Sequence, residues 1–365
     1  MSLTALPNDC LLACLARVPY VDLRNGLPST SKSLRDAVTS AAFRKTREAA
    51  GYVEMAVFVR DRASPHANFY LIQASAAYRT LPGPPDSQGS TMMRLFSGRV
   101  DEVVTVQDYP VFRADAYHPL QNRWRKLAPL DCSTRAGPFI DSTGDDVTCG
   151  AIGSTFIVIG GDGDRGLHRN LPVDVYDSSQ DAWSRRLDLP IEGAHGSYAK
   201  AIEVDGKLWL YALDGRLQET FVYDPATQTW TLGPRLPHDL YDEDGVQWHL
   251  TAFELRKRFC LMGLFQRTPE DVSYLGFMWD PIRGAWDEAP FPMPPVIAHD
   301  GENIDNNLIV AGNVEPSSYE GPYDRRSRLF VLKPDSGEWD EWRFPDDIDW
   351  RKVRSNIAMS AVRLG

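Results

Sequence analysis

Val222-Tyr223-Asp224-Pro225-Ala226-Thr227-Gln228-Thr229-Trp230 is one copy of a pattern that recurs along the 365-residue chain. An apolar or aromatic residue is followed by a short turn-forming segment, and a large aromatic residue stands seven positions after the first. The copies run from Tyr117 to Trp124, Tyr176 to Trp183, Tyr223 to Trp230, Trp279 to Trp286 and Leu332 to Trp339, with Leu71 to Tyr78 as a worn first copy. Five of the ten tryptophans fall at this one position, so the pattern marks a structural repeat.

Each copy predicts a β-hairpin. The Asp224-Pro225 pair favours a turn, because proline fixes φ near the value that the second position of a type I turn requires. The tyrosine and the tryptophan then lie on neighbouring strands, where large side chains can pack against the next sheet. The closing aromatic residues stand 46 to 59 residues apart. Periods of about 40 to 50 residues with several short strands are typical of propeller blades, so six copies predict an all-β, six-bladed propeller.

The ends of the chain indicate how this propeller closes. Residues 53–60 have the pattern of a second strand whose own first strand is missing, and residues 356–363 are one spare strand after the last unit. We expect these two segments to pair, because closure removes the sheet edges that otherwise invite aggregation. The predicted domains are a helical module over residues 1–51 and a propeller over residues 52–365, closed by the strand at 356–363.

Composition narrows the class of protein. The net charge of −11 disfavours nonspecific binding to nucleic acid, and no apolar run approaches the roughly 20 residues of a membrane-spanning helix. The five cysteines form no CxxC pair, which argues against a disulfide framework and favours a reducing compartment. The N-terminal segment lacks the basic start of a signal peptide. We therefore expect a cytoplasmic or nuclear protein with neither nucleic-acid nor membrane partners.

The N-terminal module has helical periodicity. Apolar residues recur at helical spacing over residues 11–18, a second short element is expected over residues 22–27, and a third helix runs from Ser31 or Ser33 to Arg47. Up to Gly51 the chain carries seven basic and four acidic side chains, so this module is basic although the whole chain is acidic. Three helices in about 45 residues bury little core, which favours packing against a partner.

Two segments of this module, and the repeats after it, carry a family resemblance. Residues 6–19, Leu-Pro-Asn-Asp-Cys-Leu-Leu-Ala-Cys-Leu-Ala-Arg-Val-Pro, resemble the start of an F-box, and residues 41–47 resemble its end. The repeated Tyr-Asp-Pro…Trp pattern and Gly160-Gly161 are similar to kelch repeats. The chain therefore resembles the F-box/kelch-repeat proteins that are abundant in plants. It departs from the usual Leu-Val-Ser-Lys-Ser-Trp-Arg of the family at Ser29, Thr30 and Leu34.

The resemblance implies an adaptor function. In this family the F-box binds a Skp-family adaptor of a cullin ubiquitin ligase, and the propeller captures a target protein without any catalysis of its own. The residues expected to contact the adaptor are Leu6, Pro7, Leu11, Leu12, Leu15, Val18, Leu27 and Leu34, with Phe43 behind them. Skp adaptors are acidic in the family, so a basic module is electrostatically suitable.

Long loops on a rigid scaffold are where binding residues usually lie. In a four-stranded blade, the connections between the second and third strands share a face with the segments that join the blades, and these are the long ones here. The candidates for target binding are Arg165, His168, Arg169, His195, His238, Tyr241, Arg267, Tyr319, Tyr323 and Arg325. Arg and Tyr are enriched at interface hot spots, although a single exposed one is more often a solvated loop residue.

For three other clusters, a purely structural role stands beside a functional one. Residues 299–305, from His299 to Asp305, are rich in the oxygen ligands that hard cations prefer, but a strand separates alternate side chains, so an acidic hairpin is favoured. The acidic residues 242–244 beside His238 carry the same two interpretations. Cys10 and Cys14 lie one helical turn apart, and small buried thiols are favoured over a metal site or a nucleophile. We expect no metal and no cofactor.

Two alternatives to the ligase adaptor stay open. Kelch-type oxidases use a copper site of Tyr and His, and kelch specifier proteins use an iron site of spaced carboxylates; this chain lacks the Glu-x-x-x-Asp-x-x-x-Asp spacing, and its seven histidines are scattered. The other alternative is a kelch scaffold whose F-box has decayed, which the departures at residues 29, 30 and 34 motivate. The identity of the target is not encoded in a recognisable motif.

Overall fold

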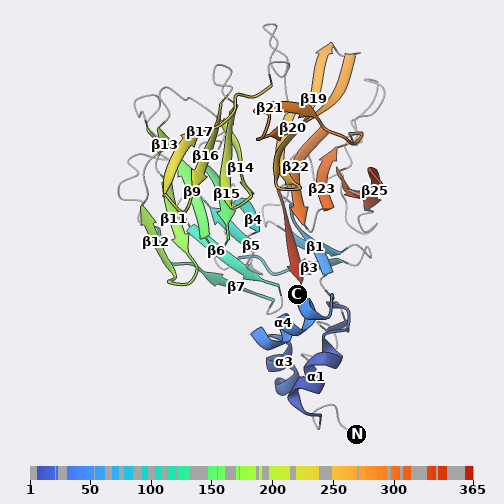
Figure 1. Ribbon diagram of the computed structural model, residues 1–365. Coiled ribbons are helices and arrows are strands. Elements are labelled where there is room, and N and C mark those ends of the chain that lie inside the picture. Colours follow the sequence, from blue (N-terminus) through green and yellow to red (C-terminus); the bar gives the residue numbers. More distant parts are fainter. Residues whose placement is uncertain are drawn as a thin grey trace.

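The computed structural model places a small helical module at one end of a ring of β-sheets (Figure 1). It describes residues 6–20, 22–23, 31–52, 54–61, 68–73, 78–84, 93–97, 103–107, 113–119, 122–130, 147–153, 155–160, 170–171, 173–185, 189–190, 197–213, 219–237, 249–268, 271–293, 297–304, 307–313, 327–333, 336–342 and 358–364. Within these segments, no helix combines the length and the hydropathy that crossing a membrane requires.

The helical module contains α1 (Asn8–Leu15), α3 (Lys32–Val38) and α4 (Ala41–Ala49). Its core is formed by the buried side chains of Leu11, Leu12, Leu15, Ala16, Leu23, Leu34, Val38 and Phe43. The described part of the module therefore has a small core of its own, drawn from α1, α3, α4 and the segment after α1.

The predicted third helix is in fact two helices, α3 and α4, and a single helix over residues 31–47 was wrong. The N–H of Thr39 donates to the carbonyl oxygen of Arg35 at the end of α3. The hydroxyl of Ser40 then accepts the N–H of Phe43 at 3.1 Å, which is the geometry of a helix N-cap. The helical run is therefore interrupted at Thr39 and Ser40, and α4 begins at Ala41.

The strands form six four-stranded antiparallel sheets and one two-stranded pair within the described residues. The first sheets comprise β26 (Ala358–Leu364) with β1 (Glu54–Asp61), β2 (Asn68–Gln73) and β3 (Tyr78–Leu81); β4 (Met93–Ser97), β5 (Val103–Gln107), β6 (Arg113–His118) and β7 (Arg123–Lys126); and β8 (Val147–Ile152), β9 (Thr155–Gly160), β11 (Val173–Asp177) and β12 (Ala182–Arg185). The others comprise β14 (Ser197–Val204), β15 (Lys207–Leu213), β16 (Thr220–Asp224) and β17 (Thr229–Leu232); β18 (His249–Leu255), β19 (Arg258–Thr268), β20 (Asp271–Asp280) and β21 (Ala285–Glu288); and β22 (Ile297–Ile304), β23 (Asn307–Asn313), β24 (Ser327–Lys333) and β25 (Glu338–Trp342). The pair is β10 (Asn170–Leu171) with β13 (Leu189–Pro190).

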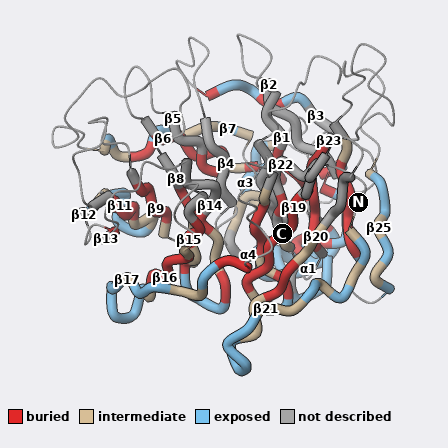
Figure 2. The backbone as a smooth tube through the Cα atoms, turned by 90° about the horizontal axis from the view of Figure 1, so that it is seen from above, coloured by how far each residue is buried: buried red, intermediate tan, exposed pale blue. Residues whose placement is uncertain are grey.

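These sheets are arranged as a β-propeller. The innermost strands β26, β4, β8, β14, β18 and β22 each contact the next one, and β22 contacts β26 again, so the circuit is closed. Viewed from above, buried residues include much of β9, β15, β16 and β19, and exposed residues gather in outer turns such as those at β17 and β21 (Figure 2). The closing contact is made by β26, which pairs with β1 from Ala358 opposite Arg60 to Leu364 opposite Glu54. This is the pairing that the sequence led us to expect, whereas the domain boundary after residue 51 stays a prediction.

The repeated aromatic residues lie opposite one another on the third and fourth strands. Tyr176 is the partner of Trp183, and Tyr223 is the partner of Trp230. Their ring centroids are 5.2 Å and 5.1 Å apart. In the first copy, Tyr78 lies opposite Ile72. The sequence pattern had placed Leu71 opposite Tyr78, so the spacing in this copy is one residue shorter than in the others.

The indole N–H groups tie each sheet to the segment that follows the preceding sheet. They donate at 2.6–2.7 Å to backbone carbonyl oxygens, in the pairs Trp124 to Pro82, Trp183 to Ala128, Trp286 to Arg235 and Trp339 to Pro292. Trp230 differs, because its indole nitrogen is buried and has no hydrogen-bond partner among the described residues. The repeat therefore encodes contacts between sheets as well as within them.

Candidate functional site

Helix α1 has a buried and an exposed side. Leu11, Leu12 and Leu15 are 5%, 6% and 3% exposed and belong to the core of the module. Because an α-helix has 3.6 residues per turn, residues 10, 13 and 14 lie on the other side, and all three are exposed. Leu6, Pro7, Cys10, Ala13 and Cys14 form an uncharged exposed strip, which we call the α1 face.

The residues predicted to contact an adaptor divide between this face and the core. Leu6 and Pro7 are exposed, and Val18 is half-buried against the core. Leu11, Leu12, Leu15 and Leu34 are buried inside the module, so their side chains stabilise its fold. Leu27 lies outside the described residues. That these residues contact an adaptor stays a prediction. Among those described, only the exposed ones present their side chains to a partner.

The expectation that Cys10 and Cys14 are buried thiols was wrong. Both cysteines are exposed, because the leucines of α1 occupy the side that packs against α3 and α4. Helical spacing put the two cysteines on one side correctly, but it does not say which side of the helix is covered. Sequence reasoning therefore missed two members of the α1 face.

The strands run between two ends of the propeller, and the helical module is at one of them. The hydroxyl of Tyr20 donates to the carbonyl oxygen of Pro119 at 2.5 Å, and Pro119 follows β6, the third strand of its sheet. In an antiparallel sheet, the connection between the second and third strands lies at the opposite end. β19 and β20 extend furthest in that direction and project away from the helices (Figure 1).

Of the ten residues predicted to bind a target, only Arg267 lies within a described element. Its position in β19 places it in the projecting hairpin, close to the turn that joins β19 to β20. The other nine, Arg165, His168, Arg169, His195, His238, Tyr241, Tyr319, Tyr323 and Arg325, lie outside the described residues. The strand ends that flank residues 161–172 and 314–326 belong to the same end of the propeller as Arg267.

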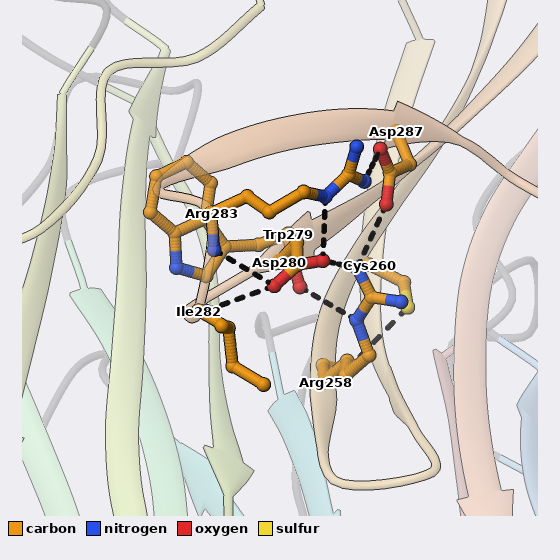
Figure 3. A network of polar contacts seen from close by, with 7 residues as sticks. All are labelled: Arg258, Cys260, Trp279, Asp280, Ile282, Arg283 and Asp287. Carbon is orange, nitrogen blue, oxygen red and sulfur yellow. Dashed lines mark hydrogen bonds and ion pairs between the residues drawn. The ribbon is translucent and has the colours of Figure 1, made fainter.

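The turn between β20 and β21 displays an apolar side chain beside a charged network (Figure 3). Ile282 is 94% exposed, and its N–H donates to Oδ1 of Asp280 at 2.8 Å. Nε of Arg283 donates to Oδ2 of Asp280 at 2.9 Å. Hydrogen bonds from Arg283 are the main cause that lowers the pKa of Asp280 to about 2.

Arg258 joins the same network from the neighbouring strand. Its Nε donates to the carbonyl oxygen of Trp279 at 2.7 Å, and its Nη2 lies 3.2 Å from Oδ2 of Asp287. Asp287 is also paired with Arg283. These charges satisfy one another and fix the shape of the turn, so the network has a structural role.

The acidic cluster at residues 299–305 lies largely on β22, which forms a hairpin with β23. Nδ2 of Asn303 donates to Oε2 of Glu254 at 2.5 Å, which links β22 to β18 of the neighbouring sheet. Within the part of the chain that the structure describes, no group of three His, Cys, Asp or Glu residues is placed to hold a metal ion. His238 and residues 242–244 lie outside it.

Comparison with known proteins gives the helical module a family. The F-box domain family matches residues 3–46, which contain α1, α3 and most of α4. The N-terminal module is an F-box domain. The chain is also weakly similar to kelch-repeat proteins, which together with the F-box domain supports an F-box/kelch protein.

The kelch similarity rests on short stretches. Kelch repeat and BTB domain-containing protein 8 of Xenopus tropicalis is 30% identical over 92 residues, which is 22% of this chain and 15% of that protein. Kelch-like protein 35 of Mus musculus is 25% identical over 123 residues, 34% of this chain and 19% of that protein. The chain thus spans less than a fifth of the length of these curated relatives. Among solved structures, YjhT aligns with 73% of this chain and 86% of its own, at 14% identity and a TM-score of 0.47.

Proposed function

We propose that this F-box/kelch chain is the substrate-recognition adaptor of a cullin–Skp–F-box ubiquitin ligase. The F-box domain at residues 3–46 is the observation that carries the proposal. In this proposal the α1 face binds a Skp-family adaptor, and the far end of the propeller binds a target protein. The chain performs no reaction itself; it raises the effective concentration of the target near the ubiquitin-loaded enzyme.

The distribution of the two surfaces supports this arrangement. The F-box domain lies at the end of the propeller that carries the turns after the third strands, and the β19–β20 hairpin with Arg267 lies at the other end. Two partners can therefore bind without competing for space. We further propose that the six sheets are six kelch-type blades, and that the protein acts in the cytoplasm or the nucleus of a plant cell.

Charge and packing in the F-box domain also fit an acidic adaptor. Lys32, Arg35 and Lys45 are exposed on α3 and α4, and complementary charge speeds association and selects partners. Leu34 stands where the family usually has a tryptophan, and it is buried in the core of the domain at 6% exposed. This departure is thus accommodated inside the domain, away from the α1 face.

A pull-down with a purified Skp-family protein tests the proposal. The test variant is Ala13→Asp, which places a charge in the middle of the α1 face without entering the core. Ala42→Asp is the matched control, because Ala42 is also exposed on a helix of the same domain. We expect the wild type and Ala42→Asp to bind and Ala13→Asp to bind at least about tenfold more weakly, as burying an unpaired charge costs several kcal/mol.

Circular dichroism of the three proteins shows whether the F-box domain is folded in each. A folded wild type that binds no Skp-family protein refutes the proposal and favours a ligase-independent kelch scaffold. Equal binding by Ala13→Asp refutes the α1 face as the contact surface. Substitutions such as Leu11→Asp are unsuitable, because Leu11 is buried in the core and its loss unfolds the domain.

A further inference from the structure

Arg47, in the last turn of α4, is a completely buried charged residue. Its guanidinium group donates in three directions: Nε to the carbonyl oxygen of Tyr52 at 3.1 Å, Nη1 to that of Val18 at 2.6 Å, and Nη2 to Oε1 of Glu54 at 2.7 Å. A buried charge is tolerated only when it is paired and hydrogen-bonded. Because Glu54 is the first residue of β1, this one side chain joins the F-box domain to the propeller.

Glu54 and Tyr20 extend this connection to a second sheet. Oε1 of Glu54 also accepts the N–H of Tyr20 at 2.7 Å. Tyr20 is 3% exposed, and its hydroxyl donates to Pro119 at 2.5 Å. β1 and β6, which Pro119 follows, belong to neighbouring sheets of the propeller, because β26 contacts β4. The F-box domain is therefore attached at two separate points, which restricts rotation in a way that a single point cannot.

The segment that joins the two domains is short and is held by hydrogen bonds. Gly51 has a φ of 70°, in the left-handed region that glycine adopts without a steric penalty. The N–H of Tyr52 donates to the carbonyl oxygen of Arg47, and the N–H of Ala50 donates to that of Thr46, both at 3.0 Å. These bonds end α4 in a Schellman turn, and β1 begins three residues after Gly51.

From these contacts we infer that Arg47, Glu54 and Tyr20 are positioning residues that hold the F-box domain and the propeller as one rigid body. Residues at the junction set the direction in which the far end of the propeller points relative to the α1 face. The functional consequence rests on the proposed function: a target held by the propeller is presented to the ligase at a fixed orientation. The rigidity itself follows from the junction alone.

Distances between two spin labels test the inference on the isolated full-length protein. One nitroxide is attached to Cys10, which is exposed, and the other to a cysteine that replaces the 94% exposed Ile282. Cys14 and Cys132 are replaced by serine, while Cys149 and Cys260 are buried and stay unlabelled. The width of the distance distribution then reports how firmly the domains are held.

We expect a single narrow distribution in this background and at least a twofold broader one in Glu54→Gln and in Tyr20→Phe. Arg47→Lys is expected to broaden it as well, because an ammonium group cannot reproduce the planar fork of a guanidinium. Tyr52→Phe is the matched control for Tyr20→Phe, since the junction uses only the backbone of Tyr52. Its distribution is expected to stay as narrow as that of the background.

The result that overturns the inference is an unchanged width in both Glu54→Gln and Tyr20→Phe, with circular dichroism showing folded proteins. A Tyr52→Phe distribution as broad as that of Tyr20→Phe overturns it too. Because no adaptor is present in this experiment, its outcome is independent of the pull-down. A rigid protein that binds no Skp-family protein refutes the proposed function alone, and a flexible one that binds refutes the inference alone.

Discussion

At the scale of the residue, the tryptophans at positions 124, 183, 286 and 339 each make two kinds of contact. Each ring packs against the aromatic or apolar residue on the neighbouring strand, as in Trp183 against Tyr176. Each indole N–H donates to a backbone carbonyl oxygen between 42 and 55 residues earlier in the chain. A large apolar ring with one polar atom suits a site that is covered on one side and lies beside backbone on the other.

Trp230, which lacks this hydrogen bond within the described part of the chain, allows the contribution of the indole N–H to the free energy of unfolding to be measured. Trp183 donates to Ala128 at 2.7 Å, whereas the buried indole nitrogen of Trp230 has no partner among the described residues. Both rings pack on a tyrosine at nearly the same distance. We expect Trp183→Phe to cost about 1 kcal/mol more of the free energy of unfolding than Trp230→Phe, the net value of one hydrogen bond.

Urea unfolding of the two variants and the wild type measures this difference. The loss of ring area is common to both substitutions, so it largely cancels in the comparison. Equal costs for the two variants would show that the indole N–H groups contribute nothing beyond the packing of their rings.

The pH dependence of the β20–β21 turn follows from Asp280. Hydrogen bonds from Arg283 lower the pKa of this carboxyl from its ordinary 3.8 to about 2. A group whose pKa is lower in the folded state stabilises the fold above its unfolded pKa, and this contribution is lost as pH falls through the folded value. We expect the stability difference between the wild type and Asp280→Asn to be constant above about pH 5 and to shrink towards pH 2.

Unfolding by urea at a series of pH values checks this expectation. The network is on the surface, where salt screens charges, so a small difference that decreases further in high salt is expected. A difference that grows as the pH is lowered would contradict the assignment of Asp280 as an ionised acceptor.

At the scale of the element, caps and turns decide where the helices and strands end. Ser40 separates α3 from α4 by accepting the N–H of Phe43. We expect Ser40→Ala to destabilise the start of α4 by about 1 kcal/mol, the usual cost of losing an N-cap. Ser33→Ala is the control, since Ser33 is exposed inside α3, where alanine has the higher helix propensity.

Amide hydrogen exchange resolved along the chain measures this effect in α4, because local opening can be followed separately from global unfolding. Faster exchange in α4 of Ser40→Ala, with Ser33→Ala unchanged, is the expected result. Unchanged exchange in both variants would mean that packing alone defines the start of the helix.

Local signals in the sequence predicted many of these elements. Asp205-Gly206 has turn chemistry, and its φ values of 49° and 77° bear this out in the β14–β15 hairpin. Arg256-Lys257 makes a turn of the same kind between β18 and β19, with φ values of 51° and 61°. Neither residue favours such angles, so this turn is imposed by the pairing of the long strands and has no local signal.

The candidate site was harder to predict than the fold. Helical spacing grouped Leu11, Leu12 and Leu15 correctly, but the same spacing describes a face that packs inside a domain and one that binds a partner. The structure buries these residues and exposes Cys10 and Cys14 instead. The contacts of Arg47 had no signal in the sequence, because its acceptors Val18 and Glu54 are distant in sequence or on another element.

At the scale of the whole molecule, the chain closes its propeller by returning to its beginning. β26 pairs with β1 along its length and also contacts β4 and β22 of the neighbouring sheets. A repeat count alone did not require this arrangement; the missing first strand of the first unit and the spare last strand did. The F-box domain is attached at the same place, since Glu54 lies opposite Leu364 in this pairing.

Deleting residues 356–365 tests the closure. The truncation exposes the edge of β1 and opens a gap between β4 and β22, and an uncovered strand edge is a template for pairing with another chain. We expect soluble aggregates in size-exclusion chromatography with light scattering, and fast hydrogen exchange in β1. A chain that lacks only Gly365 is the control, because Gly365 follows β26, and it is expected to remain monomeric.

The truncation also separates closure from the attachment of the F-box domain. A synthetic peptide of residues 356–365 is added in excess to the truncated protein. If β26 acts only as a closing strand, the peptide restores the monomer, because it covers the edge of β1 again. Restoration also returns the backbone partner of Glu54, so the spin-label distribution narrows with it. A truncated protein that is monomeric and unfolds cooperatively without the peptide would refute the closure, since nothing would then depend on the pairing of β26 with β1.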